Sequence, residues 1–257
     1  MLEKNSRKVV EHVKSYYREL YRGKINPTVK VCSGSVLARR LGYSLELLDW
    51  LTDHDFPWDY IHPCGNPVRK GLFEPGDFVL NLGCGIGLDA CALMFEATEE
   101  LKAEVGYVVV NVDVVSEVLE RACRWVASLR ELPDDFTLLW VCADALKLPF
   151  THETFDVVLM NGVFNVFPDK KLLLEELRRV IKKGGRLVIA DIFVSTSLPD
   201  YVKTEPDAWA WCIAGALTEE EFFELLRSSG FGPCRGLDKE AIDDAFYRGV
   251  FAAERVS

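Results

Sequence analysis

A short apolar run followed by three closely spaced glycines constrains the fold more than any other feature of this sequence. Residues 78–82 (FVLNL) are typical of a buried β-strand, and a Pro-Gly-Asp turn precedes them. Gly83, Gly85 and Gly87 follow at alternate positions, and a helix is expected to begin at Leu88. Such a strand, turn and helix N-terminus form a nucleotide site, because glycines let the backbone approach a ligand and the first helical N–H groups point at it.

Beyond residue 76, segments typical of strands alternate with segments typical of helices. This alternation predicts an α/β fold with a doubly wound, Rossmann-like, mostly parallel sheet. One helix is expected to begin after Asp169 and to end at Gly184-Gly185. The further strands are expected over residues 107–112, 136–141, 155–160 and 186–190, with two more β-like segments over 233–237 and 245–255.

The first 70 residues differ from the rest, because they contain helical patterns and loops but no strand. Apolar side chains recur at helical spacing up to residue 22, and two shorter helical pieces follow over 35–41 and 45–51. Seventy residues of this kind are too few for an independent core. We therefore expect residues 1–70 to form a helical cap over the cofactor site of a domain formed by residues 71–257.

Composition excludes several classes of partner. The net charge is −10 and the basic residues are dispersed, which argues against nucleic acid. No apolar run approaches the roughly 18–20 residues of a membrane span, and the polar N-terminus has no signal-peptide core, so we expect no membrane association and a cytoplasmic location. There are eight cysteines but no C-x-x-C pattern, so we expect no metal site.

Polar residues stand where three of the expected strands end. Asp113 follows the second strand, Asp144 follows the third, and Asn161 follows the fourth. Ligands of doubly wound sheets lie beyond the carboxyl ends of the central strands, so these residues are candidates for binding a cofactor. A carboxylate such as Asp113 can accept hydrogen bonds from both hydroxyls of a ribose.

The pattern G-C-G-x-G after an apolar strand resembles motif I of the class I S-adenosylmethionine (SAM) methyltransferases, and the final pair of β-like segments resembles the reversed hairpin, with an antiparallel last strand, that closes their sheet. The resemblance implies SAM as cofactor, S-adenosylhomocysteine (SAH) as product, and a glycine turn around the methionine half of SAM. It also implies that Asp144 and the Ala145 N–H read the adenine. The family's usual acidic residue in the first strand is Asn81 here, which brings no charge toward the cationic end of SAM. The cofactor-binding residues expected on this basis are Asn81, Gly83, Gly85, Gly87, Asp113, Val114, Asp144, Ala145, Leu146 and Asn161.

Two alternatives to a methyltransferase stay open at this point. Counted from Gly85, the sequence G-x-G-x-x-A reaches Ala90 and fits the dinucleotide fingerprint, although it begins two residues late. That would make the chain an NAD-dependent oxidoreductase. The other alternative is a non-catalytic SAM-binding module whose acceptor site has been lost.

Three stretches resemble the arsenite methyltransferase family specifically. They are LGYS with CGNP (residues 41–44 and 64–67), NGVFNVFPDK (161–170) and WCIAGAL (211–217). In that family cysteine thiolates hold trivalent arsenic, whose lone pair attacks the sulfonium methyl. The resemblance assigns the late thiol to Cys212 and an early one to Cys64, with Cys32 as a further candidate. The family's cysteine after the fourth-strand Asn is Gly162 here, and glycine cannot bind arsenic.

Two explanations of the missing cysteine follow. Either the remaining cysteines bind arsenic, or a methylated arsenical that needs only two thiols, or the fold serves another acceptor and the cysteines are packing residues. We therefore expect a SAM-dependent methyltransferase acting on a small acceptor, either a trivalent arsenical or a small organic molecule. Methyl transfer to an acceptor that is already nucleophilic depends mainly on positioning, so no general base is assigned. The sequence leaves the oligomeric state open.

Overall fold

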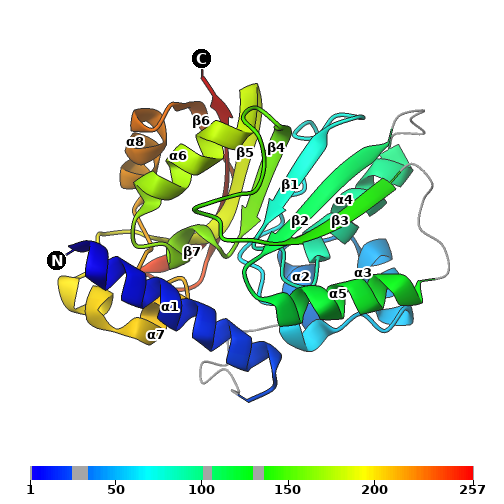
Figure 1. The fold of residues 1–257 in the computed structure, drawn as a ribbon, viewed down its shortest axis with the longest axis horizontal. Helices are drawn as coiled ribbons and strands as arrows, with labels where there is room; N and C mark the ends of the chain where they lie inside the picture. The colour runs from blue at the N-terminus through cyan, green and yellow to red at the C-terminus, as the bar shows by residue number, and fades with distance from the viewer. Residues whose placement is uncertain (1, 25–33, 101–105, 130–135, 257) are drawn as a thin grey trace.

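The computed structural model describes residues 2–24, 34–100, 106–129 and 136–256, and its centre is a seven-stranded sheet (Figure 1). The strand order is β3-β2-β1-β4-β5-β7-β6. Strands β1 to β5 run parallel, whereas β7 runs antiparallel to both of its neighbours, as the sequence predicts for the last strand. The strands are β1 (Phe78–Leu82), β2 (Tyr107–Asp113), β3 (Phe136–Cys142), β4 (Phe155–Asn161), β5 (Ile181–Val194), β6 (Phe231–Ala241) and β7 (Phe246–Arg255).

Helices cover both faces of the sheet, which is the doubly wound arrangement expected from the alternating sequence (Figure 1). Buried side chains of α2, α3, α4 and α5 share one core with one face of the sheet, and those of α6 and α8 share a second core with the other face. The helices are α1 (Leu2–Tyr21), α2 (Gly34–Arg40), α3 (Leu45–Asp53), α4 (Leu88–Glu100), α5 (Ser116–Ser128), α6 (Lys170–Val180), α7 (Pro206–Ala210) and α8 (Glu219–Ser228), with short 3-10 turns at Trp58–Tyr60, Phe164–Val166 and Asp200–Thr204.

Side-chain caps fix the beginnings of three helices, and one of them, at Asp169, is where the sequence analysis expects it. The Ser44 hydroxyl accepts a hydrogen bond from the Leu47 N–H at the start of α3, and Asp169 caps α6 in the same way. Thr218 and Glu221 form a reciprocal capping box at the start of α8. These caps satisfy N–H groups that would otherwise lack an intrahelical partner.

The predicted end of one helix is wrong. We expect α6 to continue to Gly184-Gly185, but it ends at Val180, and Ile181 already pairs with Phe155 as the first residue of β5. In the sheet, the backbone of Ile181 pairs with that of Phe155, and its apolar side chain is fully buried. Gly184, with φ +73°, lies in the irregular part of β5 before regular pairing resumes at Arg186.

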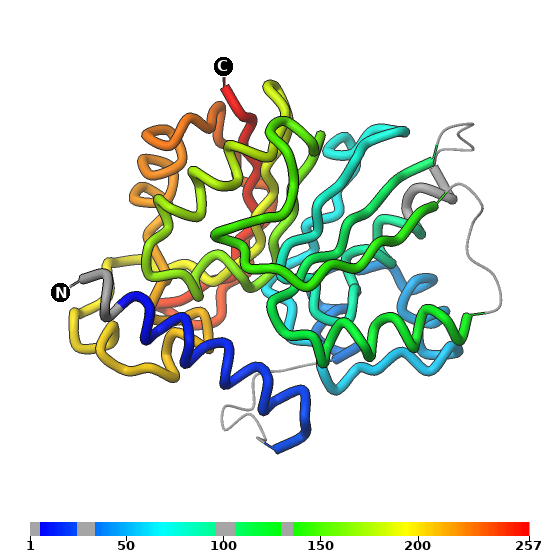
Figure 2. Tube along the Cα trace, viewed as in Figure 1, coloured from blue at the N-terminus to red at the C-terminus, as the bar shows by residue number. Residues whose placement is uncertain are grey.

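Helix α1 lies across the carboxyl edge of the sheet, beside α7 at one end and near α5 at the other (Figures 1 and 2). His12 pairs with Asp207 at a distance of 2.8 Å, and Arg22 pairs with Glu117 at 2.5 Å. By contrast, α2 and α3 pack into the same core as α4. Of the helices that the structure describes within residues 1–70, α1 is therefore the one that spans the two halves of the carboxyl edge.

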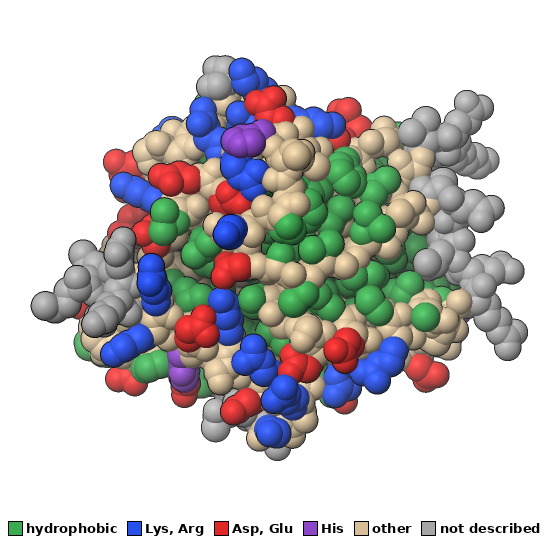
Figure 3. Space-filling view, viewed as in Figure 1, with side chains coloured by type: hydrophobic (Ala, Val, Ile, Leu, Met, Phe, Trp, Pro, Cys, Tyr) green, Lys and Arg blue, Asp and Glu red, His purple; other side chains and the backbone are tan. Residues whose placement is uncertain are grey.

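One region of the front sheet face carries half-buried or exposed apolar side chains. Hydrophobic side chains gather over β2 and β3, where α6 and α8 do not reach (Figure 3). Leu139 on β3 is 45% exposed, and Val108, Val141 and Phe150 are half-buried. This region is therefore an apolar patch on the face of the molecule that Figure 3 shows.

Candidate active site

A pocket opens at the carboxyl ends of β1, β2 and β4, beneath α1. The glycine turn and all three predicted strand-end residues contribute to its wall: Gly83 and Gly85, Asp113 and Val114, Asp144 and Ala145, and Asn161. Helix α1 contributes Val10, Val13, Lys14, Tyr17 and Tyr21. The pocket therefore lies where a doubly wound sheet binds its ligands.

The glycine turn is held against β2 by the backbone. The N–H groups of Gly83 and Cys84 both donate to the carbonyl oxygen of Val112, at 2.7 and 3.0 Å. Gly83 has φ +69°, and a Cβ there would come within 2.2 Å of Val163 Cγ2. A residue with a side chain would therefore be strained and would collide with the segment after β4.

Asp113 organises the turn as well as the pocket wall. Its Oδ2 accepts a hydrogen bond from the Gly85 N–H at 3.1 Å, and its Oδ1 accepts one from the Val115 N–H at 2.9 Å. Burial raises the pKa of Asp113 above its usual value, while these N–H groups act in the opposite direction. The Val114 N–H acts on the same carboxylate, but a carboxylate has about four lone-pair sites, so the group can still accept a hydrogen bond from a ligand.

Asp144 lies two residues beyond the end of β3, the strand that pairs with β2, and it already has a cationic partner. Its Oδ1 accepts from the Leu146 N–H at 2.9 Å, and Lys14 Nζ on α1 donates to its Oδ2 at 3.0 Å. The pKa of Lys14 is raised by Asp144, despite partial burial, which lowers it. Sequence reasoning missed this ion pair, because it joins residues that lie far apart in the chain.

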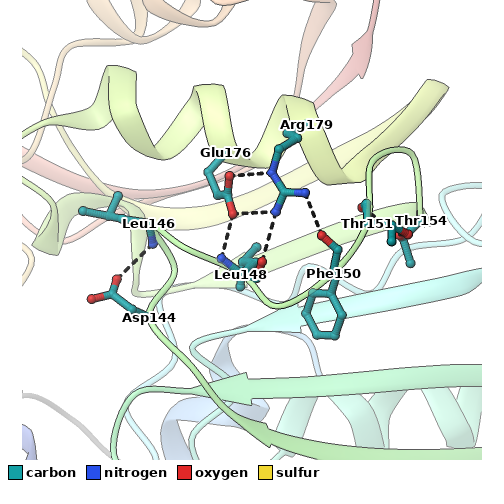
Figure 4. Close-up of polar contacts among 8 residues, drawn as sticks. All are labelled: Asp144, Leu146, Leu148, Phe150, Thr151, Thr154, Glu176 and Arg179. Carbon is teal, nitrogen blue, oxygen red and sulfur yellow. Dashed lines mark hydrogen bonds and ion pairs between the residues drawn. The ribbon is translucent and has the colours of Figure 1, made fainter.

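An arginine and a glutamate on α6 hold the segment that follows Asp144 (Figure 4). Arg179 donates to the carbonyl oxygens of Leu148 and Phe150, at 3.0 and 2.6 Å, and to both carboxylate oxygens of Glu176. Glu176 in turn accepts the Leu148 N–H at 2.6 Å. This cluster fixes the segment between β3 and β4, whose first residues form the pocket wall.

Three predicted cofactor residues do not line the pocket. Asn81 is buried in the sheet, where its amide donates to Asn111 Oδ1 at 2.9 Å. Gly87 lies against Trp140, since a Cβ there would come within 2.7 Å of that ring. Leu146 donates its N–H to Asp144, and its side chain packs against the second core.

Other lining residues were not predicted to bind the cofactor. His62, near Cys64, is part of the wall, and burial lowers its pKa. Asp89, in the first turn of α4, also lines the pocket and is only 7% exposed. The sequence signal for Asp89 is an acid two residues after Gly87, in the first turn of the following helix, where the helix dipole favours a negative charge.

The two cysteines assigned from the family resemblance meet behind the pocket wall, at Gly162. Cys212 Sγ donates to the Gly162 carbonyl oxygen at 3.2 Å, and a Cβ on Gly162 would lie 3.4 Å from Cys64 Sγ. Both thiols are buried and neither is in a disulfide. Contact with the Cys64 thiol and burial raise the pKa of Cys212, so it is a protonated thiol here. Cys32, the third candidate, lies outside the described residues.

A buried acid and a buried base stand beside Cys212. Asp191, one residue beyond the part of β5 that pairs with β4, accepts hydrogen bonds from the N–H and the side-chain amide of Asn165, each at 3.0 Å. Burial raises the pKa of Asp191 to about 6 and lowers that of Lys170 to about 8. Cys212 therefore lies in a polar, fully packed surrounding rather than in a purely apolar one.

Two kinds of feature are absent from the part of the chain that the structure describes. Across residues 2–24, 34–100, 106–129 and 136–256, no cluster of three or more His, Cys, Asp or Glu side chains is arranged to hold a metal ion. In the same ranges, no helix combines the length and the apolar character that crossing a membrane requires.

Residues 73–230 match the sequence model of a protein family whose description is "Methyltransferase domain". The chain belongs to this family of SAM-dependent methyltransferases. The matched range includes the glycine turn, Asp113, Asp144 and Asn161, and so most of the pocket's sheet edge. Membership of a methyltransferase family decides against the dinucleotide alternative, and SAM is the cofactor that this family uses.

Among its relatives, this methyltransferase is similar to arsenite methyltransferases. It is 32% identical to the arsenite methyltransferase of Halobacterium salinarum over 194 residues, which cover 76% of this chain and 46% of that protein. It also resembles the crystal structure of an arsenic(III) SAM methyltransferase from Chlamydomonas reinhardtii, with a TM-score of 0.63, 26% identity, and coverage of 88% of this chain and 75% of that one. The chain spans about half the length of the curated relatives it matches.

Other relatives act on different acceptors. The methyltransferase is 31% identical to the 2-methyl-6-phytyl-1,4-hydroquinone methyltransferase of Synechocystis over 133 residues, which cover 52% of this chain and 37% of that protein. Similarity of the methyltransferase domain therefore does not by itself fix the acceptor.

Proposed function

We propose that this pocket binds SAM with its ribose on Asp113, its adenine beside Asp144 and Ala145, and its methionine half between the glycine turn and Asn161. The free acceptor capacity of Asp113 supports this, and so does the turn at Gly83, where no side chain fits. SAM, when bound, supplies an electrophilic methyl group on a cationic sulfur.

We further propose that the acceptor is a trivalent arsenical with two exchangeable ligands, held by Cys64 and Cys212. The observation that carries this proposal is the meeting of the two thiols at Gly162, which itself lines the pocket. Arsenic(III) is a soft centre that prefers thiolate ligands. Because Gly162 stands where the family has a third cysteine, two thiols suit a monomethylated arsenical better than arsenite.

The chain's own task in this reaction is to hold the acceptor. Exchange of the two thiols onto arsenic replaces two oxygen or thiol ligands and releases the thiol protons with them. The arsenic lone pair then forms the new bond to carbon as the sulfur–carbon bond breaks, SAH leaves with that electron pair, and arsenic becomes formally pentavalent. Two molecules of a thiol such as glutathione in the medium return it to the trivalent state and are themselves oxidised to one disulfide.

The test is an assay of the purified protein with SAM, glutathione and either methylarsonous acid or arsenite. Arsenic species are separated by chromatography, and SAH is measured in the same samples. We expect dimethylated arsenic from methylarsonous acid and much less methylation of arsenite. Cys64→Ser and Cys212→Ser should each lower the rate at least 10-fold, whereas Cys234→Ser, in a half-buried thiol on β6, should not.

Two outcomes would contradict the arsenical proposal. If the cysteine variants methylate as fast as the parent protein, the thiols are packing residues. If SAM binds but no arsenical is methylated, the chain serves another acceptor or is the non-catalytic module. A screen with small quinols and amines, read out as SAH release, distinguishes those two cases.

A further inference from the structure

The carboxylate of Asp89 is buried in the pocket wall without a positively charged partner. Tyr43 donates its hydroxyl to Asp89 Oδ1 at 2.5 Å, and the Asn161 side-chain amide lies 3.3 and 3.2 Å from the two carboxylate oxygens. Both of these donors are neutral. Among the described residues, no lysine, arginine or histidine forms an ion pair with Asp89, although its side chain is only 7% exposed.

A buried carboxylate of this kind is costly to keep ionised unless a cation joins it. Burial raises the pKa of Asp89 to about 6, and the hydrogen bonds from Tyr43 and Asn161 only partly offset that effect. The position of Asp89 in the first turn of α4, a helix of 13 residues, favours the ionised form to a smaller extent. At neutral pH the wall therefore carries a negative charge that the described chain leaves without a counter-ion.

A further hydrogen-bond acceptor lies beside Asp89. The Gly65 carbonyl oxygen belongs to the same cluster: it accepts from the Asn161 amide at 2.9 Å and lies 3.0 Å from the Tyr43 hydroxyl oxygen, whose proton points to Asp89. Asp89 itself lines the pocket, and its two carboxylate oxygens suit a ligand group with several N–H donors. An ammonium group has three such donors, whereas a sulfonium group has none.

We infer that Asp89 binds the ammonium group of the cofactor's methionine half and acts as its counter-ion. Asn81, where the family has an acid, brings no charge and pairs with Asn111 inside the sheet. In this chain the negative charge comes instead from the first turn of α4. This inference rests on the family's cofactor and not on the identity of the methyl acceptor, so it can fail or hold independently of the arsenical proposal.

Calorimetry with three ligands tests the assignment. SAM and SAH both carry the ammonium group, whereas 5′-methylthioadenosine lacks the whole amino-acid end. Asp89→Asn should lower the affinities for SAM and SAH by the same factor, about 10- to 100-fold, as for the loss of a hydrogen bond to a charged group. The affinity for methylthioadenosine should change less than twofold. The matched control is Glu46→Gln, an exposed acid in the first turn of α3, which should change none of the three.

A second measurement begins with the unchanged protein. The unchanged protein should bind the desamino analogue of SAH at least 10-fold more weakly than SAH. Asp89→Asn should bind the two with similar affinity, because the partner of the amino group is gone.

Each other outcome overturns the inference. A loss for SAM that exceeds the loss for SAH would mean that Asp89 acts on the sulfonium. An equal loss for all three ligands would mean that Asp89 merely maintains the pocket. Equal binding of SAH and its desamino analogue by the unchanged protein would mean that the ammonium has no partner here.

Discussion

Gly162 lies so close to Cys64 that a Cβ added to the glycine would be 3.4 Å from the cysteine sulfur. The carbonyl oxygen of the same glycine accepts a hydrogen bond from Cys212. A side chain at position 162 would therefore point at the thiol pair, and the backbone there has the left-handed φ of +68° that glycine tolerates best.

Gly162→Cys should accordingly add a third thiol to the pair. We expect the variant to methylate arsenite faster than the parent protein, because arsenite has three ligands to exchange. The matched variant is Gly162→Ser, which has nearly the same shape but no soft ligand. Both should be destabilised by about 1–2 kcal/mol because of the left-handed backbone, as measured by urea unfolding, and equal arsenite activities of the two would contradict the prediction.

Asp113→Ala should weaken SAM binding by about 1.5–3 kcal/mol, as for hydrogen bonds to a charged group. The loss has two sources, since the carboxylate faces the pocket and also holds the Gly85 N–H. Titration calorimetry measures it, with Glu220→Gln on the exposed side of α8 as the control. An unchanged dissociation constant would remove Asp113 from the cofactor site.

Lys14→Met should strengthen SAM binding several-fold at low salt. The Lys14 ammonium occupies Asp144 Oδ2, for which the adenine amino group would compete. Lys14→Arg keeps the charge and should bind SAM like the parent protein. Because the ion pair is partly exposed, raising the salt concentration should reduce the difference between Lys14→Met and the parent protein. A difference that grows with salt would contradict this.

SAM affinity should fall as the pH drops through about 6. The pKa of Asp89 is about 6, so acid neutralises the counter-charge of the cofactor's ammonium group. The groups that face Asp89 do not titrate there: the pKa values of Tyr43, Cys84 and Cys91 are all raised by burial above already high values, so these groups stay neutral. Asp113 also has a raised pKa and contributes to the same fall. Comparison with Asp89→Asn, measured from pH 7.5 to 5.5, isolates the part that belongs to Asp89, and identical profiles would contradict the prediction.

Arg179→Met should destabilise the fold by about 2–3 kcal/mol, because it leaves the Leu148 and Phe150 carbonyl oxygens without their charged donor. Exposed Arg178, its neighbour on α6, offers the control Arg178→Met. Urea unfolding followed by circular dichroism measures both, and similar midpoints for the two variants would show that the cluster in Figure 4 adds little.

The sequence predicts the sheet well because its signals are local. Apolar runs indicate the strands. Residues such as Ser44, Asp169 and Thr218 indicate helix starts, because each side chain accepts a hydrogen bond from the N–H group three residues further along the chain. The end of α6 is predicted wrongly because a long-range pairing, Ile181 with Phe155, competes with local helix propensity.

The pocket wall is predictable to a similar extent. Asp113, Asp144 and Asn161 are found because strand ends meet at one edge of a sheet. Lys14 is not, since it reaches Asp144 only once α1 has folded across that edge. Asp89 can be found in the sequence from its position near the glycine turn. Its neutral partners, Tyr43 and Asn161, cannot be found in this way, because they are far from it in the sequence.

The side-chain amide of Asn161 makes contacts through both its nitrogen and its oxygen. Its nitrogen lies on the Asp89 side of the pocket, while its oxygen accepts the backbone N–H of Cys64 at 2.8 Å. A methyl donor bound to Asp89 would therefore change the hydrogen bonds of the same Asn161 amide that holds the backbone of Cys64. Binding of the methyl donor should thus change the affinity for the acceptor, and thermodynamic linkage requires the acceptor to change the affinity for the donor by the same factor.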